Sequence, residues 1–502
     1  MHLLPTVLGL ALGPPLVNAA TLLAGGTVIA WDESTSNLAV LRNGSVLIED
    51  DTITAVFSGV YNGTLPLNLT RVDTTHDIVS TGFIDTHRHS WQTAFKTLGS
   101  NITLLQYLPH FGSPGPAGTL FSPDDVYVGQ LAGLYEALNA GVTTIVDYAH
   151  CAWSPAHARA ALEAEFESGI RAVYAYNFGD YGATNFSFEA QVEQFEELVG
   201  EARFGSAVEL GISYDGFVYS AESETRTVLD LARDHNVSLL TTHANGGVYG
   251  AANFPSTLDR FGFLNQSIPL IFAHASYLNV EDEQLLRQYN HFISVTPESE
   301  MHYGHLHPNS HLILDQASLG VDTHFTFSTD ILTQARIWLQ SVRKILYGEV
   351  VDRRRVPANN PMSVNQAFQL ATRSGGLAMR RPDLGVLAAG AKADLVVWSG
   401  RSPSLLGWRD PVAAIMLHAS VGDVKHVMVD GQFVKRDGKL TTQNYEGLQE
   451  RFLQSAERIQ DAWAEMPIPA SESEASAGVP YERALEVDVQ RGEGTGYGPL
   501  FF

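Results

Sequence analysis

The sequence has little cysteine, little positive charge and few long apolar runs. Cys151 is the one cysteine among 502 residues, so no internal disulfide can form and stability has to come chiefly from a packed core. Lys and Arg number 31 against 55 Asp and Glu, a formal net charge of −24. Such a surface cannot neutralise phosphates, which argues against a nucleic-acid partner. Beyond residue 19 no segment is long and apolar enough to cross a membrane, which argues against a membrane partner.

The composition is that of a folded protein with more than one domain. Apolar residues make up 45% of the chain and charged residues 17%, which is typical of globular proteins. A chain of this length allows two or three domains, each with an ample core.

The first 19 residues have the pattern of a signal peptide. Thr6–Leu12 is a short apolar run, Pro14-Pro15 follows it, and Val17–Ala19 has the small-residue spacing of a cleavage site. Seven Asn-x-Ser/Thr sequons accompany this pattern, starting at Asn43, Asn62, Asn68, Asn101, Asn185, Asn236 and Asn265. We therefore expect a secreted, N-glycosylated protein that loses residues 1–19.

Two segments far apart in the chain have a β-rich pattern. Residues 20–78 contain short β-type runs separated by Asn, Gly and Asp, and residues 385–441 return to the same pattern with a hairpin signal at Asp430-Gly431. We expect the two segments to form one small β-sandwich domain. Residues 442–502 are expected to form a C-terminal helix, over 445–466, and a tail rich in Ser, Glu and Gly.

Between these segments, residues 79–384 alternate short apolar runs with helical patterns. Eight runs are expected to be strands: 78–91, 141–147, 169–176, 208–213, 237–243, 268–274, 291–297 and 325–330. They are nearly continuous in apolar residues, as in a parallel sheet buried on both faces. This pattern predicts an α/β fold with a (β/α)₈ TIM barrel.

Histidine and aspartate gather where these strands are expected to end. His87 and His89 are one residue apart, so they leave a strand on the same side and could grip one metal ion. His243, His274 and Asp330 also fall at strand ends. Because catalytic groups of such barrels lie at the C-terminal strand ends, a site is expected there.

Two longer motifs stand out in the sequence, Val79–His89 (VSTGFIDTHRH) and Gly385–Val397 (GVLAAGAKADLVV). The first resembles the first-strand signature of the amidohydrolase superfamily, and the second resembles the C-terminal return of that superfamily into its sandwich. The closest similarity is to the branch that contains cytosine and guanine deaminases and triazine chlorohydrolases. The resemblance implies a mononuclear metal site with His87, His89, His243 and Asp330 as ligands. It also implies that His274 contacts the attacking water or the substrate.

The chain departs from this resemblance at one position. Deaminases of the branch carry Glu three residues after the fifth-strand histidine, where this chain has Gly246. Glu298 is expected to take over the acid role, with Glu300 and His302 as alternatives. The fourth strand ends in Ile212–Asp215 without a lysine, so the two-metal form of the site is not expected.

The substrate pocket is expected to be lined by histidine and aromatic side chains. The candidates are His150, Trp91, Tyr176 and His302. The aromatic rings could form a wall for a flat substrate.

We therefore expect a metal-dependent amidohydrolase that attacks a C–N bond of amide, lactam or amidine type in a small heterocyclic compound. The metal would activate water, and Asp330 would accept its proton. Zinc is the first choice of divalent ion, although iron, manganese and cobalt suit the same donors. The alternatives are a deaminase of a purine-like ring, a lyase or cyclase, and a metal-holding binding protein that does not catalyse. The expected partner is a small molecule, with a homo-oligomer as an open alternative.

Overall fold

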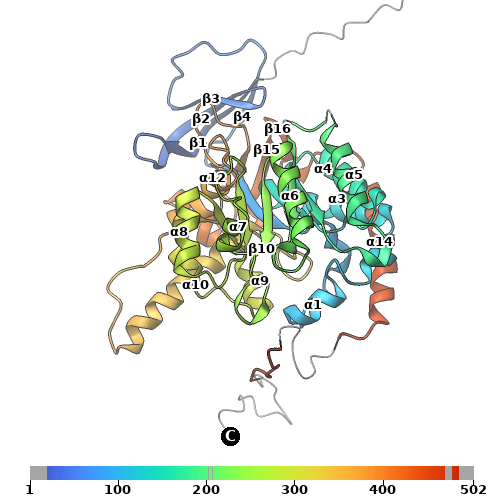
Figure 1. Cartoon of the computed structure of the whole chain (residues 1–502). Coiled ribbons are helices and arrows are strands. Elements are labelled where there is room, and N and C mark those ends of the chain that lie inside the picture. The colour runs from blue at the N-terminus through green and yellow to red at the C-terminus, as the bar shows by residue number, and fades with distance from the viewer. Residues whose placement is uncertain (1–19, 202, 206, 470–477, 486–502) are drawn as a thin grey trace, which may run out of the picture.

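A parallel eight-stranded barrel occupies the centre of the protein (Figure 1). The computed structural model describes residues 20–201, 203–205, 207–469 and 478–485. The expected signal peptide, 1–19, and most of the expected tail lie outside these residues. The sheet runs in the order β13-β12-β11-β10-β9-β8-β7-β6. The predicted TIM-type barrel is confirmed, together with a separate sheet from the N- and C-terminal segments.

Seven of the eight barrel strands lie where the sequence predicts them. The bounds are β6 Phe83–Arg88, β7 Val142–Ala149, β8 Arg171–Phe178, β9 Val208–Tyr214, β10 Leu240–His243, β11 Leu270–Ala273, β12 Phe292–Val295 and β13 Ala317–Leu319. Every residue of β7 and β8 is buried, because the barrel interior covers one face and helices cover the other.

The predicted eighth strand, 325–330, is wrong. The eighth strand is β13, and residues 325–330 form a turn and an irregular segment instead. Phe325 packs against Phe95 and Phe111 rather than alternating between the faces of a sheet. The Phe-Thr-Phe alternation therefore resembles a strand without forming one.

The barrel closes between β6 and the residues after β13. The backbone N–H groups of Val321 and Asp322 both donate to the carbonyl oxygen of His87, at 3.0 and 2.8 Å. The N–H of His89 donates to the carbonyl oxygen of Asp322 at 3.2 Å. These bonds hold the chain around Asp322 directly beside the His-x-His pair.

Helices cover the outside of the barrel (Figure 1). Their bounds are α3 Pro123–Asn139, α4 Pro155–Ser168, α5 Phe188–Val199, α6 Glu222–Asp234, α7 Pro255–Arg260, α8 Val280–Tyr289, α9 Pro297–His302, α10 Ile331–Asp352, α11 Val364–Leu370 and α12 Arg373–Ala378. Several begin where a polar side chain caps the free N–H groups of the first turn, as Ser122, Ser154, Ser187 and Asn279 do. None of the described helices is long and apolar enough to span a membrane.

The second sheet combines strands from both ends of the chain. Its members are β1 Ala20–Asp32, β2 Asn37–Glu49, β3 Thr52–Ser58, β4 Leu69–Asp73, β5 Ile78–Thr81, β14 Leu395–Trp398, β15 Val424–Val429, β16 Gln432–Arg436 and β17 Lys439–Leu440. Strand β5 joins the two parts, since it pairs with β1 and with β14.

The sheet passes into the barrel at Gly82, between β5 and β6. A Cβ atom at this position would lie 2.1 Å from the Thr143 side chain, so only glycine fits. Arg171 at the start of β8 donates from Nε to Asp394 at 2.7 Å and links the barrel to the sheet a second time. Helix α14, Tyr445–Ala464, packs against α3, where Ser455 donates to Asp125 at 2.6 Å.

Candidate active site

Three histidines and one aspartate converge at the C-terminal end of the barrel. One donor atom each of His87, His89, His243 and Asp322 lies within 4.8 Å of the other three. Oδ1 of Asp322 is 3.4 Å from Nε2 of His87 and 3.1 Å from Nε2 of His89. Nε2 of His243 is 3.4 Å from Nε2 of His89. The four side chains come from the ends of β6 and β10 and from the segment after β13.

The donor set fits a divalent metal ion. His87 is fully buried, and neither of its ring nitrogens makes a hydrogen bond. Burial lowers the pKa of His87 well below its ordinary value, which keeps the imidazole neutral as metal binding requires. Nδ1 of His89 is 3.0 Å from the carbonyl oxygen of Tyr148, so its Nε2 is the free donor atom. Three imidazoles and one carboxylate are ligands typical of zinc.

Asp215 orients the third histidine. Its Oδ2 accepts a hydrogen bond from Nδ1 of His243 at 2.8 Å, and its Oδ1 accepts one from the backbone N–H of His243, also at 2.8 Å. Burial raises the pKa of Asp215, but the adjacent His243 outweighs burial and brings it to about 2. A carboxylate that holds the outer nitrogen of a metal-binding histidine fixes its tautomer and ring orientation. From the sequence alone, Asp215 marks only the end of the fourth strand, where no lysine is present.

Asp322, rather than the expected Asp330, completes the ligand group. Asp330 is the N-cap of α10, where its carboxylate accepts from the backbone N–H of Thr333 at 2.6 Å and from its hydroxyl at 2.9 Å. The assignment of Asp330 as ligand is therefore corrected to Asp322, since the eighth strand lies earlier than expected. Ser299 donates to Oδ2 of Asp322. Burial raises the pKa of Asp322, but the adjacent His87 and His89 rings outweigh burial and hold the pKa well below its usual range.

His274 lies beside the ligand group, as expected. Its ring centroid is 5.3 Å from that of His87 and 5.8 Å from that of His243. The two alternative acids after β12 differ in placement. Glu300 is fully buried with Oε1 3.7 Å from Nδ1 of His274. Glu298 instead accepts from Ser328 and Gln334, at 2.6 and 2.9 Å. The expectation that Glu298 is the catalytic acid is corrected, because its carboxylate is hydrogen-bonded to Ser328 and to Gln334 of α10.

His150 lies against the site, with Trp91 behind it. The His150 ring stacks on His89 at 3.9 Å between centroids. Nε1 of Trp91 donates to Nδ1 of His150 at 2.9 Å, so the neutral His150 ring carries its proton on Nε2. Trp91 is fully buried, and its ring packs against Trp153. Trp91 therefore supports His150 and does not itself line a pocket.

Tyr176 and His302 do not reach the ligand group. The hydroxyl of Tyr176 donates to Gln194 of α5 at 3.0 Å, so this side chain faces the outer helices. Nε2 of His302 is 3.2 Å from the carbonyl oxygen of Gly99, and its ring packs against Tyr303. Both expected pocket positions are corrected: Tyr176 lies on the outward face of β8, and His302 is turned to the segment after β6.

The backbone at Gly246 excludes a side chain there. Gly246 has φ +71° and ψ −161°, a region almost restricted to glycine. A Cβ atom would lie 2.2 Å from the ring of Phe254. The glutamate expected from the resemblance is thus missing from the sequence and also excluded by the local structure.

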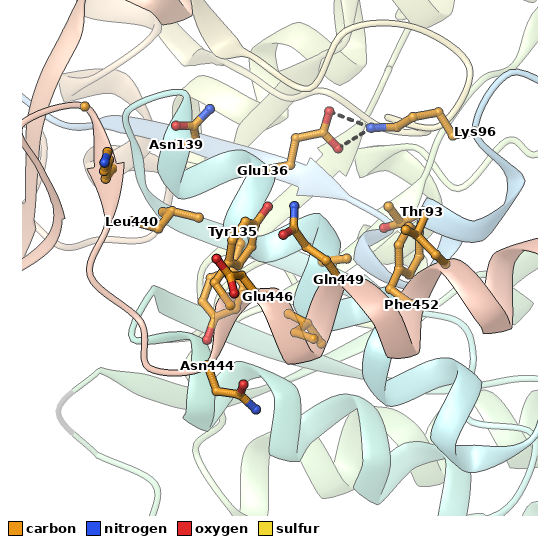
Figure 2. A pocket seen from close by; sticks show the side chains of 16 residues that line it. Thr93, Lys96, Tyr135, Glu136, Asn139, Leu440, Asn444, Glu446, Gln449 and Phe452 are labelled. Atoms are coloured by element: carbon orange, nitrogen blue, oxygen red, sulfur yellow. Dashed lines mark hydrogen bonds and ion pairs between the residues drawn. The ribbon is translucent and has the colours of Figure 1, made fainter.

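The ligand group opens to solvent beside β9 and β10. The side chain of His243 is 21% exposed and that of Asp215 42%, whereas the other three ligands are nearly buried. A separate cavity of about 820 Å³ lies on the outside of the barrel, between α3, β17 and α14 (Figure 2). Figure 2 shows the ion pair of Lys96 and Glu136 at its edge. None of the four ligands is among the described residues that line this cavity.

The barrel and its three-histidine, one-aspartate group define a metal-dependent hydrolase scaffold. The chain belongs to the Amidohydrolase family, whose sequence model matches residues 78–434. The 5-methylthioadenosine/S-adenosylhomocysteine deaminase of Thermococcus kodakarensis is 25% identical over 414 residues, which cover 79% of this chain and 91% of that protein.

Two solved structures have the same fold. An adenosine deaminase from Xanthomonas campestris with bound zinc superposes with a TM-score of 0.75 at 18% identity, covering 88% of this chain and 99% of that one. The zinc complex of atrazine chlorohydrolase TrzN from Arthrobacter aurescens gives 0.73 at 20% identity, covering 87% and 100%. The chain thus shares the fold of a deaminase and of a triazine chlorohydrolase.

Proposed function

We propose that the chain is a zinc-dependent aminohydrolase that removes the exocyclic amino group of a purine-like ring as ammonia. The observation that carries the proposal is the convergence of His87, His89, His243 and Asp322 at the barrel mouth. The curated relative from Thermococcus kodakarensis is named as a deaminase of adenosine-type compounds, and a zinc-bound neighbour as an adenosine deaminase. The C–N bond broken would be of the amidine type.

The residues of the site have two roles: some hold the metal and others transfer the proton. When bound, zinc supplies a water of lowered pKa and polarises the bond under attack. His87, His89 and His243 would hold it through their imidazole nitrogens. Asp322 is held at Oδ2 by Ser299, and this oxygen takes the proton of the attacking water. His274 contributes a polar ring next to the nucleophile.

The departing nitrogen needs a proton, and this chain has glycine at position 246 where a glutamate could have donated it. Gly246 leaves no carboxylate on the segment after β10, and Asp215 is engaged by His243. Asp322 therefore both takes the proton from water and returns it to the leaving amine. Nε2 of His150 offers a further hydrogen-bond donor beside His89. Such proton transfer contributes about 10²- to 10⁴-fold to the rate.

Hydrolysis of an amide or lactam is the second candidate. Gly246 favours it, because the carboxylate of the related deaminases is missing. A lyase, a cyclase or a non-catalytic metal-holding protein on the same scaffold are the remaining alternatives.

Ammonia release separates these candidates. Zinc-loaded protein is incubated with aminated purines and their nucleosides and, separately, with amides and lactams, and ammonia and products are measured. His243→Ala, which removes one ligand, is the matched control. Ammonia from a purine-type compound, absent with His243→Ala, supports the proposal. Turnover of amides or lactams alone would reject the proposal and support the second candidate. Metal binding without turnover of any compound would reject the proposal and support a binding protein.

We also propose that the chain passes through a secretory pathway and is N-glycosylated. All seven sequon asparagines are exposed: Asn43, Asn62, Asn68, Asn101, Asn185, Asn236 and Asn265. Expression in a eukaryotic secretory host, followed by glycosidase treatment, should lower the apparent mass of the secreted protein. Retention inside the cells without glycans would contradict the proposal.

A further inference from the structure

His274 has an unusual backbone conformation. His274 follows β11 with φ +66°, and Ala275 after it has φ +50°, a left-handed region that non-glycine residues adopt rarely. The N–H of His274 donates to the carbonyl oxygen of Ser294 at 2.8 Å, which fixes this turn. Strained backbone persists only where the surrounding structure determines it, and it often marks a functional position.

Among the described residues, Nδ1 of the His274 ring has a hydrogen-bond partner and Nε2 has none. Nδ1 lies 2.8 Å from Oγ1 of Thr296 and 3.7 Å from Oε1 of Glu300. No hydrogen bond of Nε2 is present among the described residues, and the ring lies within 6 Å of the rings of His87 and His243. The protonation of Nδ1 therefore decides whether Nε2 has a lone pair or a proton.

Both carboxylate oxygens of Glu300 accept hydrogen bonds. Oε1 accepts from the backbone N–H of Thr296 at 2.9 Å and lies 3.4 Å from its hydroxyl. Oε2 accepts from Nδ1 of His307 at 2.8 Å, and Nε2 of His307 is 2.7 Å from Oγ of Ser341 on α10. Burial raises the pKa of Glu300, but His274 and His307 outweigh it and bring the pKa to about 2. Glu300 is therefore an acceptor only.

The geometry points to Glu300 as a positioning residue: through Thr296 it sets the tautomer of His274 that carries the proton on Nδ1 and leaves the lone pair on Nε2. The hydroxyl of Thr296 directs its proton to Glu300, so its oxygen must accept from Nδ1–H of His274. The adjacent carboxylate also favours a proton on that edge. Nε2 can then accept a hydrogen bond from the attacking water, a role that rests on the proposed function.

The tautomer can be measured without turnover. In protein labelled with ¹⁵N-histidine, the long-range ¹H–¹⁵N spectrum distinguishes the two neutral tautomers, and the His274 signal is the one lost in His274→Ala. We expect the Nδ1–H form in the unaltered protein. Glu300→Gln and Thr296→Val should shift the signal toward the Nε2–H form or a mixture. Glu298→Gln, two residues away on α9, should leave it unchanged, because Glu298 bonds to Ser328 and Gln334.

The kinetic effect follows on the substrate that the ammonia assay identifies. Glu300→Gln and Thr296→Val should lower kcat about 10- to 100-fold with metal content and KM little changed, and Glu300→Asp should recover part of the loss. An unchanged His274 signal in both Glu300→Gln and Thr296→Val would overturn the inference whatever the activity. A shifted signal in a protein that turns over no substrate would leave the inference standing and reject the proposed function instead.

Discussion

The carboxylate of Asp215 holds His243 at two points, 2.8 Å from its Nδ1 and 2.8 Å from its backbone nitrogen. Strand β10 ends at His243, so these two bonds fix both the end of the strand and the direction of the imidazole ring. Nε2 consequently faces His89 and the metal position.

Asp215→Asn should weaken metal binding without removing it. The amide cannot stabilise the same ring orientation as the carboxylate, and loss of such an outer partner costs about 10- to 100-fold in metal affinity. Competition with a chelator measures the change. Glu209→Gln is the matched control, because Glu209 lies on β9, the strand that Asp215 directly follows, but pairs with Arg381 away from the ligand group. Equal affinities of Asp215→Asn and Glu209→Gln would contradict this role.

Gly246→Ala should destabilise the protein more than Gly262→Ala. Both glycines have positive φ, +71° and +67°, but a Cβ at Gly262 meets nothing within 4 Å while one at Gly246 meets Phe254 at 2.2 Å. Overpacking of this kind costs about 1–3 kcal/mol. Urea unfolding of the two variants measures the difference. Equal free energies of unfolding would show that Phe254 moves away without cost.

His291 should make stability depend on pH in mildly acidic solution. Its Nδ1 accepts from the N–H of Leu270 at 3.2 Å, and its Nε2 donates to the carbonyl oxygen of Leu264 at 2.8 Å. Burial lowers its pKa from 6.5 to about 4, so the folded state keeps the ring neutral. As the pH falls below 6.5 the unfolded state binds a proton first, and stability is lost until the folded ring also titrates near 4.

The effect of His291 is isolated by comparison with His291→Gln, which does not titrate. Near pH 5 the unaltered protein should have lost roughly 2 kcal/mol through this residue. The difference in unfolding free energy between the two proteins should therefore shrink by about that amount between about pH 7.5 and pH 5. A difference that stays constant over this range would contradict the prediction.

The barrel could be predicted because its strands are apolar runs with clear ends, whereas β13 has only three residues, Ala317–Leu319. A run this short between loop residues gives almost no periodic signal. Phe325 and Phe327 gave a stronger signal in a segment that is not a strand. The sequence does not point to Asp322, because the short strand before it is not recognisable. Its position after the apolar run that ends at Val321 is comparable to that of His243 at the end of β10.

Side-chain direction accounts for the other corrections. Tyr176 lies on the same face of β8 as Tyr174, whose hydroxyl donates to the carbonyl oxygen of Ala158 in α4. The alternation along β8 places both outward, but the sequence alone does not say which face is inside when both are apolar. The roles of Asp215 and Glu300 depend on contacts between separate strand ends and loops, which spacing in one sequence does not contain.

Metal content of two aspartate variants tests the central claim most directly. Asp322→Ala removes a ligand, whereas Asp330→Ala removes the N-cap of α10 and should cost about 1 kcal/mol of stability. Elemental analysis of the folded proteins should find about one zinc ion per chain in Asp330→Ala and almost none in Asp322→Ala. Zinc retained by Asp322→Ala and lost from Asp330→Ala would contradict the site described here.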